Sequence, residues 1–139
     1  MTSDANDRNR RVIEEFRAND GRVGGPFQGA TLLLLHTTGA RSGAERVNPL
    51  MYQPLEGGSW AVFASKGGAP DHPDWYRNVR AHPEVTIEVG TTTLEVAARV
   101  AEGEERDRIW STQKQTRPQF ADYEARTDRE IPVIVLERR

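Results

Sequence analysis

Two segments of the chain place cations beside glycines, a combination suited to binding a phosphate or a carboxylate. The first is a turn between two apolar runs, in which Gly39 and Gly43 flank Arg41 and Ser42, with Arg46 just beyond. Glycines let a turn expose backbone N–H groups, and guanidinium and hydroxyl groups add donors for an anion. The spacing matches neither a P-loop nor a dinucleotide-binding loop. The alternative interpretation is an ordinary hairpin with two solvated arginines.

The second segment joins an expected strand to an expected helix. Lys66 is one of only two lysines in the chain and is followed by Gly67 and Gly68. A point charge beside bare backbone can approach a phosphate closely. The alternative is a flexible connector whose lysine lies in water. In the first turn of the following helix, Trp75 and Tyr76 are more typical of core anchors than of rings that stack on a cofactor.

Other chemistries lack the residues they need. The chain has no cysteine, which excludes thiolate zinc sites, iron–sulfur clusters, disulfides and cysteine nucleophiles. His36, His72 and His82 show no metal-ligand spacing and no evident carboxylate partner, so we expect neither a zinc site nor a Ser–His pair. His36 alternates with leucines and is interpreted as half-buried. The pairs at 14–15 and 104–105, all glutamate, are interpreted as solvated helix surface.

Length and charge bound the class of protein. With 139 residues we expect a single domain over 1–139, of which residues 1–8 form a flexible N-terminus. The net charge of −2 gives no global reason to bind nucleic acid or an anionic membrane. The longest aliphatic run, Leu32–Leu35, is far shorter than a membrane span, and the polar start does not resemble a signal peptide. We therefore expect a cytoplasmic protein that uses no metal.

Hydrophobic patterning predicts an antiparallel barrel with peripheral helices, of the α+β class. Gly57–Gly58 and Gly90–Thr91 predict hairpin turns. Pro49 predicts an edge strand or a bent strand, because proline has no N–H to donate. The six predicted strands span 30–37, 46–54, 59–65, 84–89, 92–100 and 131–136. The predicted helices span 7–19, 73–81 and 103–126, the last interrupted at Pro118.

Three ordered motifs carry a resemblance to a known family. They are His36-Thr-Thr-Gly-Ala-Arg-Ser-Gly-x-x-Arg-Val-Asn-Pro-Leu50, Ala64-Ser-Lys-Gly-Gly68 and His72-Pro-Asp-Trp-Tyr-x-Asn78. The opening at residues 10–19 and the ending at 123–133 support them. With these motifs the chain resembles the deazaflavin (coenzyme F420)-dependent nitroreductase family of actinobacteria over nearly its whole length. The resemblance implies a split β-barrel, similar to FMN-binding oxidases, that binds reduced F420 and transfers hydride to an electron-poor acceptor.

The resemblance also implies which residues surround the cofactor. The phosphate and the start of the glutamate tail are expected beside Ala40, Arg41, Ser42, Arg46 and Lys66. The deazaflavin is expected along Val47, Asn48, Pro49, Leu50, Met51 and Tyr52, with Pro49 near the ring. A second wall is expected from Phe63, Ala64 and Ser65, and the ribityl chain beside Asp74, Trp75, Tyr76, Arg77 and Asn78.

The acceptor pocket is expected over the deazaflavin face, bounded by Phe16, Phe120 and Tyr123. Relatives that activate nitroimidazoles tend to carry several tyrosines before the Thr-Asp-Arg motif, whereas here only Tyr123 keeps a hydroxyl. We therefore expect Tyr123, or else water, to be the catalytic proton donor. Quinones, enones and lactones are expected as acceptors ahead of nitro compounds.

Two other classes stay open from the residues alone. One is an oxidoreductase of the related barrel that uses FMN, and the other is a carrier that binds F420 without turnover. The expected partners are a small-molecule acceptor and no nucleic acid. A quinone acceptor would imply peripheral contact with a membrane, and the chain is expected to act as a monomer or a homodimer.

Overall fold

The computed structural model describes residues 4–21 and 32–139, with side chains from Asn9 onward in the first range. The helices are α1 (Asp4–Ala18), α2 (Asp74–Ala81), α3 (Gly103–Thr116) and α4 (Gln119–Ala125), with a 3-10 turn η2 (Lys66–Gly68). The strands are β1 (Leu32–Thr38), β2 (Glu45–Met51), β3 (Gln53–Leu55), β4 (Ser59–Phe63), β5 (Glu84–Val89), β6 (Thr92–Val100) and β7 (Val133–Arg138).

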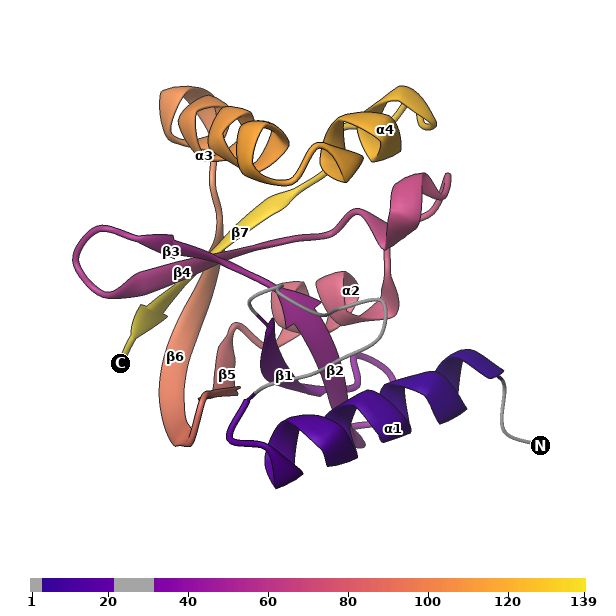
Figure 1. Ribbon diagram of the computed structural model, residues 1–139, viewed down its shortest axis with the longest axis vertical. Coiled ribbons are helices and arrows are strands. Elements are labelled where there is room, and N and C mark those ends of the chain that lie inside the picture. Colours follow the sequence, from indigo (N-terminus) through magenta and orange to yellow (C-terminus); the bar gives the residue numbers. More distant parts are fainter. Residues whose placement is uncertain (1–3, 22–31) are drawn as a thin grey trace.

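The strands form one antiparallel sheet in the order β2-β1-β5-β6-β7-β4-β3. β2 and β3 stand at opposite edges of this sheet, although only Tyr52 separates them along the chain. One residue spans no more than about 3.6 Å, so the sheet must curl until its two edges meet. β2 contacts β4 at that point, and the sheet is a curled half-barrel (Figure 1).

Side chains that alternate in direction fill both faces of the curled sheet. Leu33 and Leu35 of β1 belong to the interior cluster, while Leu32 and Leu34 lie on the opposite face under α1. This period of two is that of a β-strand. The alternation explains why all of residues 32–35 are buried, because one face of β1 packs in the interior and the other packs under α1. Trp75 of α2 joins the interior cluster.

The helices cover the outer faces of the sheet on two sides. α1 packs on the half that contains β1 and β2, while α3 and α4 pack on the half that contains β4 and β7 (Figure 1). Under α3 and α4 the ring of Phe63 lies 5.8 Å from Trp110 and 5.5 Å from Phe120, centroid to centroid. The rings contact one another edge-on or tilted, as aromatic side chains prefer.

The predicted antiparallel α+β barrel is confirmed, with seven strands among the described residues where the sequence predicts six. The run predicted at 46–54 breaks at Tyr52, because the chain crosses there from one sheet edge to the other. Pro49 lies on the edge strand β2, as predicted. Residues 30–31 of the first predicted strand lie outside the described residues, as do residues 1–3. α1 begins at Asp4, within the stretch 1–8 that we expected to be flexible.

Candidate functional site

The hairpin turn between β1 and β2 is the first half of the candidate site. The Gly39 N–H donates to the Ala44 carbonyl (2.7 Å), and the Gly43 N–H donates to the Gly39 carbonyl (3.0 Å). The Ser42 hydroxyl accepts the Ala44 N–H (3.2 Å). A Cβ on Gly39 would lie 2.6 Å from that hydroxyl oxygen and 3.3 Å from the Ala44 carbonyl oxygen, so a side chain there would displace Ser42. Arg41 is exposed near its tip.

Asn78 of α2 connects this turn to the rest of the fold by hydrogen bonds. Its side-chain oxygen accepts the N–H of Ala40 (3.0 Å), and its amide nitrogen donates to the Thr37 hydroxyl (3.1 Å). Asn78 is buried, and both ends of its side chain have partners within the protein. Since α2 is anchored in the interior cluster through Trp75, the helix sets the position of the turn that carries Arg41.

Residues 64–73 join β4 to α2 and form the second half of the site, which we call the Lys66 loop. Ser65 has φ −82° and ψ −37°, and Lys66 follows with a left-handed φ of +47°. Gly68 and Ala69 donate their N–H groups back to the carbonyls of Ser65 (2.9 Å) and Lys66 (3.1 Å). The N–H groups of Ser65, Lys66 and Gly67 have no partner among the described residues. Consecutive right-handed and left-handed residues turn such groups toward one concave, anion-binding side.

α4 lies directly against the Lys66 loop at Gly68. This glycine has φ +84°, and a Cβ on it would lie 2.7 Å from the carbonyl oxygen of Tyr123 and 3.0 Å from the Cβ of Arg126. The ring of Tyr123 is half-buried and packs edge-on against Phe120, with 5.1 Å between centroids. Among the described residues its hydroxyl has no hydrogen-bond partner. The predicted catalytic phenol therefore stands on the helix that touches the predicted phosphate loop.

Arg129 braces the Lys66 loop, and sequence reasoning gave it no role. Its guanidinium donates to three backbone carbonyls of the loop and contacts His72 (3.1 Å). Burial lowers the pKa of Arg129. Burial, and then the positive charge of Arg129, lower the pKa of His72. The one signal in the sequence was the position of Arg129 in the Thr-Asp-Arg motif.

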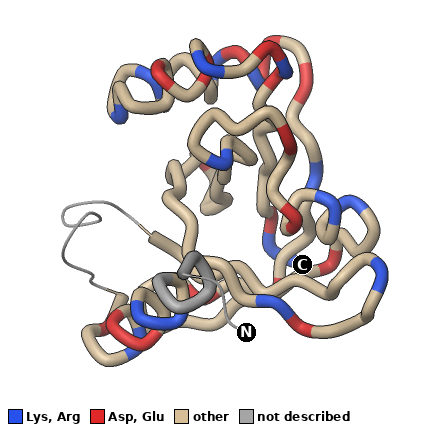
Figure 2. Tube along the Cα trace, turned by 90° about the vertical axis from the view of Figure 1, so that its right-hand side faces the viewer, with Lys and Arg blue, Asp and Glu red and all other residues tan. Residues whose placement is uncertain are grey.

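The cations of the two halves are free of acidic partners within the described part of the chain. Arg41, Arg46 and Lys66 are exposed and make no ion pair there. Most exposed surface is mixed in charge, and acidic and basic residues alternate along the helices at both ends of the molecule (Figure 2). Cations that do form ion pairs are Arg17, Arg77, Arg99, Arg106, Lys114 and Arg139.

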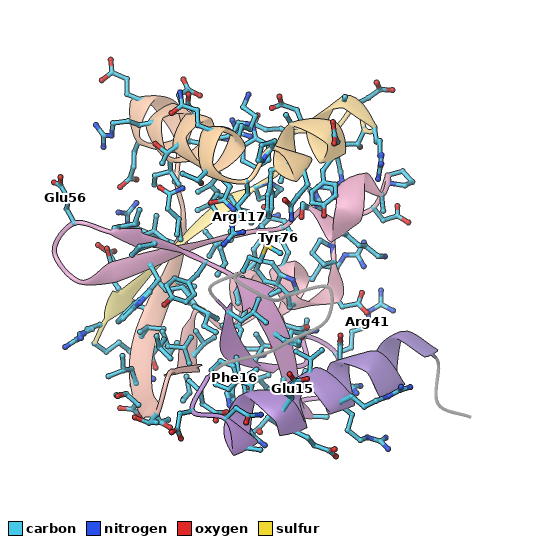
Figure 3. All side chains as sticks on the ribbon, viewed as in Figure 1. Glu15, Phe16, Arg41, Glu56, Tyr76 and Arg117 are labelled. Atoms are coloured by element: carbon cyan, nitrogen blue, oxygen red, sulfur yellow. The ribbon has the colours of Figure 1, made fainter. Side chains whose placement is uncertain are left out.

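Several predicted cofactor contacts lie in the core. Trp75 and Tyr76 belong to the interior cluster, and these surroundings are those of core anchors. Tyr76 lies within the curl of the sheet, whereas Arg41 lies at its rim (Figure 3). Phe63 is buried beneath α3 and α4, and Ala64 is buried in the interior. Of this expected second wall, Ser65 contributes its free backbone N–H.

The three residues predicted to bound an acceptor pocket do not meet around one opening. Phe16 is 1% exposed and packs beneath α1, and Phe120 is 5% exposed among the rings under α3 and α4. Met51 packs against both clusters and is the residue they share. Tyr123 alone of the three keeps partial exposure.

The predicted ring-binding segment follows the edge strand β2. Val47 and Met51 pack toward α1, while Leu50 and Tyr52 pack toward the interior. Burial raises the pKa of Tyr52. Half-buried throughout are Val47, Asn48, Pro49, Leu50, Met51 and Tyr52. On α2, the exposed Asp74 and Arg77 pair with each other (3.5 Å).

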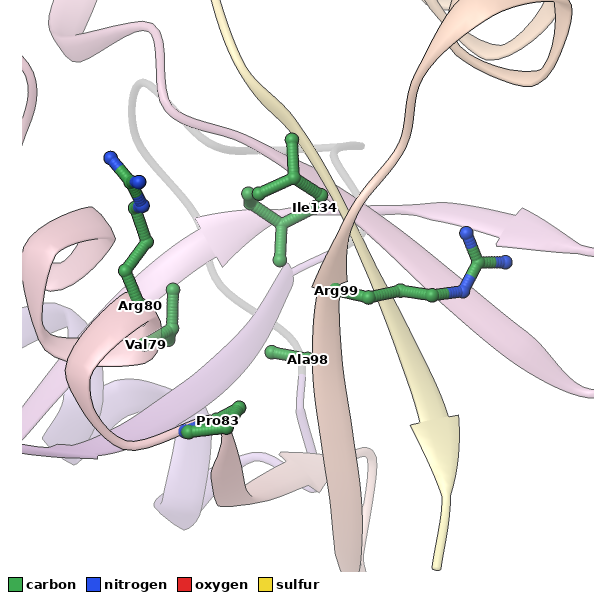
Figure 4. A pocket seen from close by; sticks show the side chains of 7 residues that line it. Val79, Arg80, Pro83, Ala98, Arg99 and Ile134 are labelled. Carbon is green, nitrogen blue, oxygen red and sulfur yellow. The ribbon is translucent and has the colours of Figure 1, made fainter.

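A hollow of about 220 Å³ lies elsewhere, between the end of α2 and β6 (Figure 4). Arg80 borders it, while the guanidinium of Arg99 points away from it toward Glu105 and Glu137 (Figure 4). Its lining is Val79, Arg80, Pro83, Ala98, Arg99, Val100 and Ile134, none of which belongs to the predicted site. A wider, shallower hollow lies on the outer side of α3 and includes Arg108.

His36 is half-buried as predicted, but the expectations that it has no carboxylate partner and that Glu105 is only solvated are wrong. His36 has carboxylate partners on both ring nitrogens, Glu88 at Nε2 (2.5 Å) and Glu45 at Nδ1 (3.3 Å). Strand pairing brings these residues together, which no local spacing reveals. Glu105, expected to be solvated, accepts two hydrogen bonds from Arg99 (2.6 and 2.8 Å). No group of three or more metal-ligating side chains occurs among the described residues.

Comparison with known proteins agrees with this geometry. The family model for F420H(2)-dependent quinone reductase matches residues 8–138. The chain belongs to this family. An F420H(2)-dependent quinone reductase of Mycobacterium tuberculosis is 39% identical over 128 residues, covering 89% of this chain and 85% of the relative. These findings confirm the predicted F420-dependent oxidoreductase, whose cofactor is reduced coenzyme F420.

Solved structures of similar chains confirm the split-barrel type for this family member. An F420-H2 dependent reductase, FDR-A, superposes with a TM-score of 0.70 at 45% identity, covering 77% of this chain and 94% of that chain. A structure described as a domain-swapped dimer superposes with a TM-score of 0.71 at 41% identity, covering 96% of each chain. Among the described helices, none has the length and apolar character needed to cross a bilayer.

Proposed function

We propose that F420 binds with its phosphate at the N–H groups of Ser65, Lys66 and Gly67, and that the acceptor is a quinone. The arrangement of the Lys66 loop carries this proposal. Its concave set of free N–H groups, beside a lysine without an acidic partner, fits a phosphate in both charge and hydrogen-bond donors. A quinone is favoured because relatives at 39% identity are named quinone reductases.

Cations from the other half of the site would extend the anion-binding surface. Arg41 and Arg46 come from the turn and strand that follow β1, and Asn78 holds that turn on α2. α2 begins where the Lys66 loop ends, so the same helix positions both halves. In a chain with a net charge of −2, unpaired cations on these two segments suit an acidic cofactor with a phosphate and glutamate carboxylates.

When bound, reduced F420 supplies a hydride. The remaining requirement is a proton for the oxygen of the reduced quinone, and we assign its donation to Tyr123. Its hydroxyl has no partner among the described residues, and its backbone touches the Lys66 loop. A phenol held about 3 Å from an oxygen that gains charge can donate to it. Phe120 packs against the ring of Tyr123 and fixes its orientation (5.1 Å).

The setting we propose is the cytoplasm, with the protein as a monomer or homodimer that touches the membrane surface when its quinone resides there. The absence of a bilayer-spanning helix among the described residues agrees with this setting. A relative at 41% identity is described as a domain-swapped dimer. Size-exclusion chromatography with light scattering distinguishes the two assembly states.

The function is tested by following the oxidation of reduced F420, with a soluble naphthoquinone, an activated enone and a nitroimidazole as parallel acceptors. We expect the naphthoquinone to give the highest kcat/KM and the nitroimidazole the lowest. Reduced FMN in place of F420 serves as the control for cofactor identity. Equal or faster oxidation of reduced FMN contradicts the cofactor assignment. F420 binding without acceptor-dependent oxidation across the panel contradicts the enzymatic role.

A further inference from the structure

Arg129 is half-buried, and its guanidinium makes three hydrogen bonds to backbone carbonyls. Its Nε donates to the carbonyl of Ala69 (3.0 Å), Nη1 donates to that of Ala64 (3.1 Å), and Nη2 donates to that of Ser65 (2.9 Å). These carbonyls come from both ends of the anion-binding turn. The planar fork of arginine fixes the directions of its five donors, so one side chain sets the spacing of all three.

The same guanidinium reaches the start of α2. Nη1 lies 3.1 Å from Nδ1 of His72, whose ring packs at a tilt against Tyr76 with 4.7 Å between centroids. A short turn in which the Thr127 hydroxyl accepts the N–H of Arg129 (3.3 Å) ties the residue to the end of α4. Arg129 therefore connects the helix of Tyr123, the Lys66 loop and α2.

Arg129 makes no ion pair in the described part of the chain, although Asp71, in the same loop, lies near enough to act on its charge and raise its pKa against the effect of burial. Its contacts are neutral carbonyls and a histidine, while the arginine of comparable burial at position 106 pairs with Glu130 (2.8 Å). Because the hydrogen-bond acceptors of Arg129 are neutral, no direct ion pair cancels its charge, which lies behind the turn. It adds positive potential at the concave side where an anion would bind.

We propose that Arg129 is the positioning residue of the cofactor loop. It draws the carbonyls of Ala64, Ser65 and Ala69 to its own side, which leaves the N–H groups of 65–67 directed to the opposite, concave side, and its charge reinforces anion binding through the loop. This inference rests on the proposed function for the identity of the anion, the F420 phosphate. The role of Arg129 in shaping the loop is independent of that identity.

The backbone conformation of this turn needs side-chain contacts that hold it in place. Lys66 is held at φ +47°, a conformation that side-chain-bearing residues adopt rarely and that persists when the surroundings enforce it. Gly67 and Gly68 follow with φ +63° and +84° and give no stiffness of their own. Without the fork of Arg129, we expect the turn to sample other conformations in which the three N–H groups diverge.

The test compares Arg129→Lys with Arg106→Lys in the full-length protein. Arg106 is the matched control because it also donates to a backbone carbonyl, that of Ile131 (2.8 Å), without touching the Lys66 loop. Three quantities are measured for each variant: the dissociation constant for oxidised F420 by fluorescence titration, amide hydrogen exchange of the peptide covering 64–72, and KM and kcat for reduced F420.

For Arg129→Lys we expect affinity for oxidised F420 to fall about tenfold or more, since losing the geometry of a charge-assisted contact has an effect of that order. Exchange of the 64–72 peptide in the free protein should rise about tenfold, and KM should rise far more than kcat. Arg106→Lys should lower the melting temperature while leaving affinity and loop exchange near the wild-type values. Equal effects of the two variants on F420 affinity, or unchanged loop exchange in Arg129→Lys, would overturn the inference.

A measurement on the wild-type protein keeps the inference testable if the variants fail to fold. In NMR spectra, oxidised F420 should shift the N–H resonances of Ser65, Lys66 and Gly67, while the Nε–H of Arg129 stays protected and shifts little. A dominant shift at Arg129 Nε–H means direct contact with the cofactor and overturns the positioning role. If none of the three loop amides responds to F420, the proposed function fails at this loop, while an Nε–H of Arg129 that exchanges freely in the unliganded wild-type protein would overturn its role in holding the loop.

Discussion

The contact between Gly68 and α4 gives a sharp prediction, because the neighbouring Gly67 supplies its control. Both glycines have positive φ, +63° at Gly67 and +84° at Gly68, so alanine is strained at either position. A Cβ at Gly67 meets no atom within 4 Å, whereas a Cβ at Gly68 lies 2.7 Å from the carbonyl oxygen of Tyr123. The pair Gly67→Ala and Gly68→Ala therefore separates backbone strain from the packing of α4 on the loop.

The expected losses of stability follow from the backbone strain at both glycines and the steric overlap at Gly68. A left-handed conformation costs an alanine roughly 1–2 kcal/mol, part of which is offset by the lower entropy of its unfolded chain, which leaves about 1 kcal/mol for Gly67→Ala. At Gly68 the opposing atom is backbone and cannot rotate away, so overpacking adds roughly 1–3 kcal/mol. We expect Gly68→Ala to lower the unfolding free energy by about 2–4 kcal/mol, which is a drop of roughly 3–5 °C in Tm per kcal/mol in a domain of this size.

Urea unfolding followed by tryptophan fluorescence measures the stability difference, and titration with oxidised F420 measures the functional one. Gly68→Ala should also weaken F420 binding more than Gly67→Ala does, because the loop must move off α4 to admit the methyl group. Equal unfolding free energies for the two variants would refute the close packing of Tyr123 on Gly68. That result would also contradict the argument that α4 positions the phenol of Tyr123 relative to the Lys66 loop.

Three further predictions address the phenol, the turn and acid stability. Tyr123→Phe keeps the ring packing and should lower kcat with a quinone by about 100-fold with little change in F420 affinity; a larger loss in Tyr52→Phe would instead assign the donor to Tyr52. Asn78→Ala removes the acceptor of the Ala40 N–H, so the unfolding free energy measured in urea should fall by about 1–3 kcal/mol and F420 should bind more weakly. An unchanged F420 affinity would show that this turn is not part of the binding site. The hydrogen bond from Arg17 holds the pKa of Glu88 below its ordinary value, so its stabilising contribution is present near neutral pH and is lost as the pH falls through the lowered pKa. Glu88→Gln should therefore lose less stability than the wild type as the pH falls below about 4.5 and through the lowered pKa, and parallel losses would contradict this pairing.

Local features of the fold could be predicted from the sequence because each depends on neighbouring residues. Pro49 has no N–H to donate, which predicts an edge position wherever the strand lies. Gly57–Gly58 and Gly90–Thr91 mark the two hairpins. The break at Tyr52 was not predicted, since it arises where the curled sheet closes, and closure depends on the order of all seven strands.

The candidate site also contains some features that the sequence predicts and others that it does not. The cations at Arg41 and Lys66 stand beside glycines in the sequence, and the structure gives them turns with an exposed side chain and free N–H groups. Phe63 was expected beside the cofactor and Phe120 beside the acceptor, yet the structure buries both, because these rings pack in the cluster under α3 and α4. Arg129 was missed since its partners lie about 60 residues away along the chain, at 64, 65 and 69.

The central claim is that the Lys66 loop holds the acidic end of F420, and a fluorescence titration with oxidised F420 tests it most directly. The comparison is between the wild type, Lys66→Ala and Arg108→Ala, the last removing an exposed cation on the outer side of α3. Loss of one charge-assisted phosphate contact should weaken binding to Lys66→Ala by about 10- to 150-fold. Arg108→Ala should bind within about twofold of the wild type, because an exposed charge outside the site is screened by salt. Wild-type affinity in Lys66→Ala, or equal losses in both variants, would contradict the assignment of the phosphate to this loop.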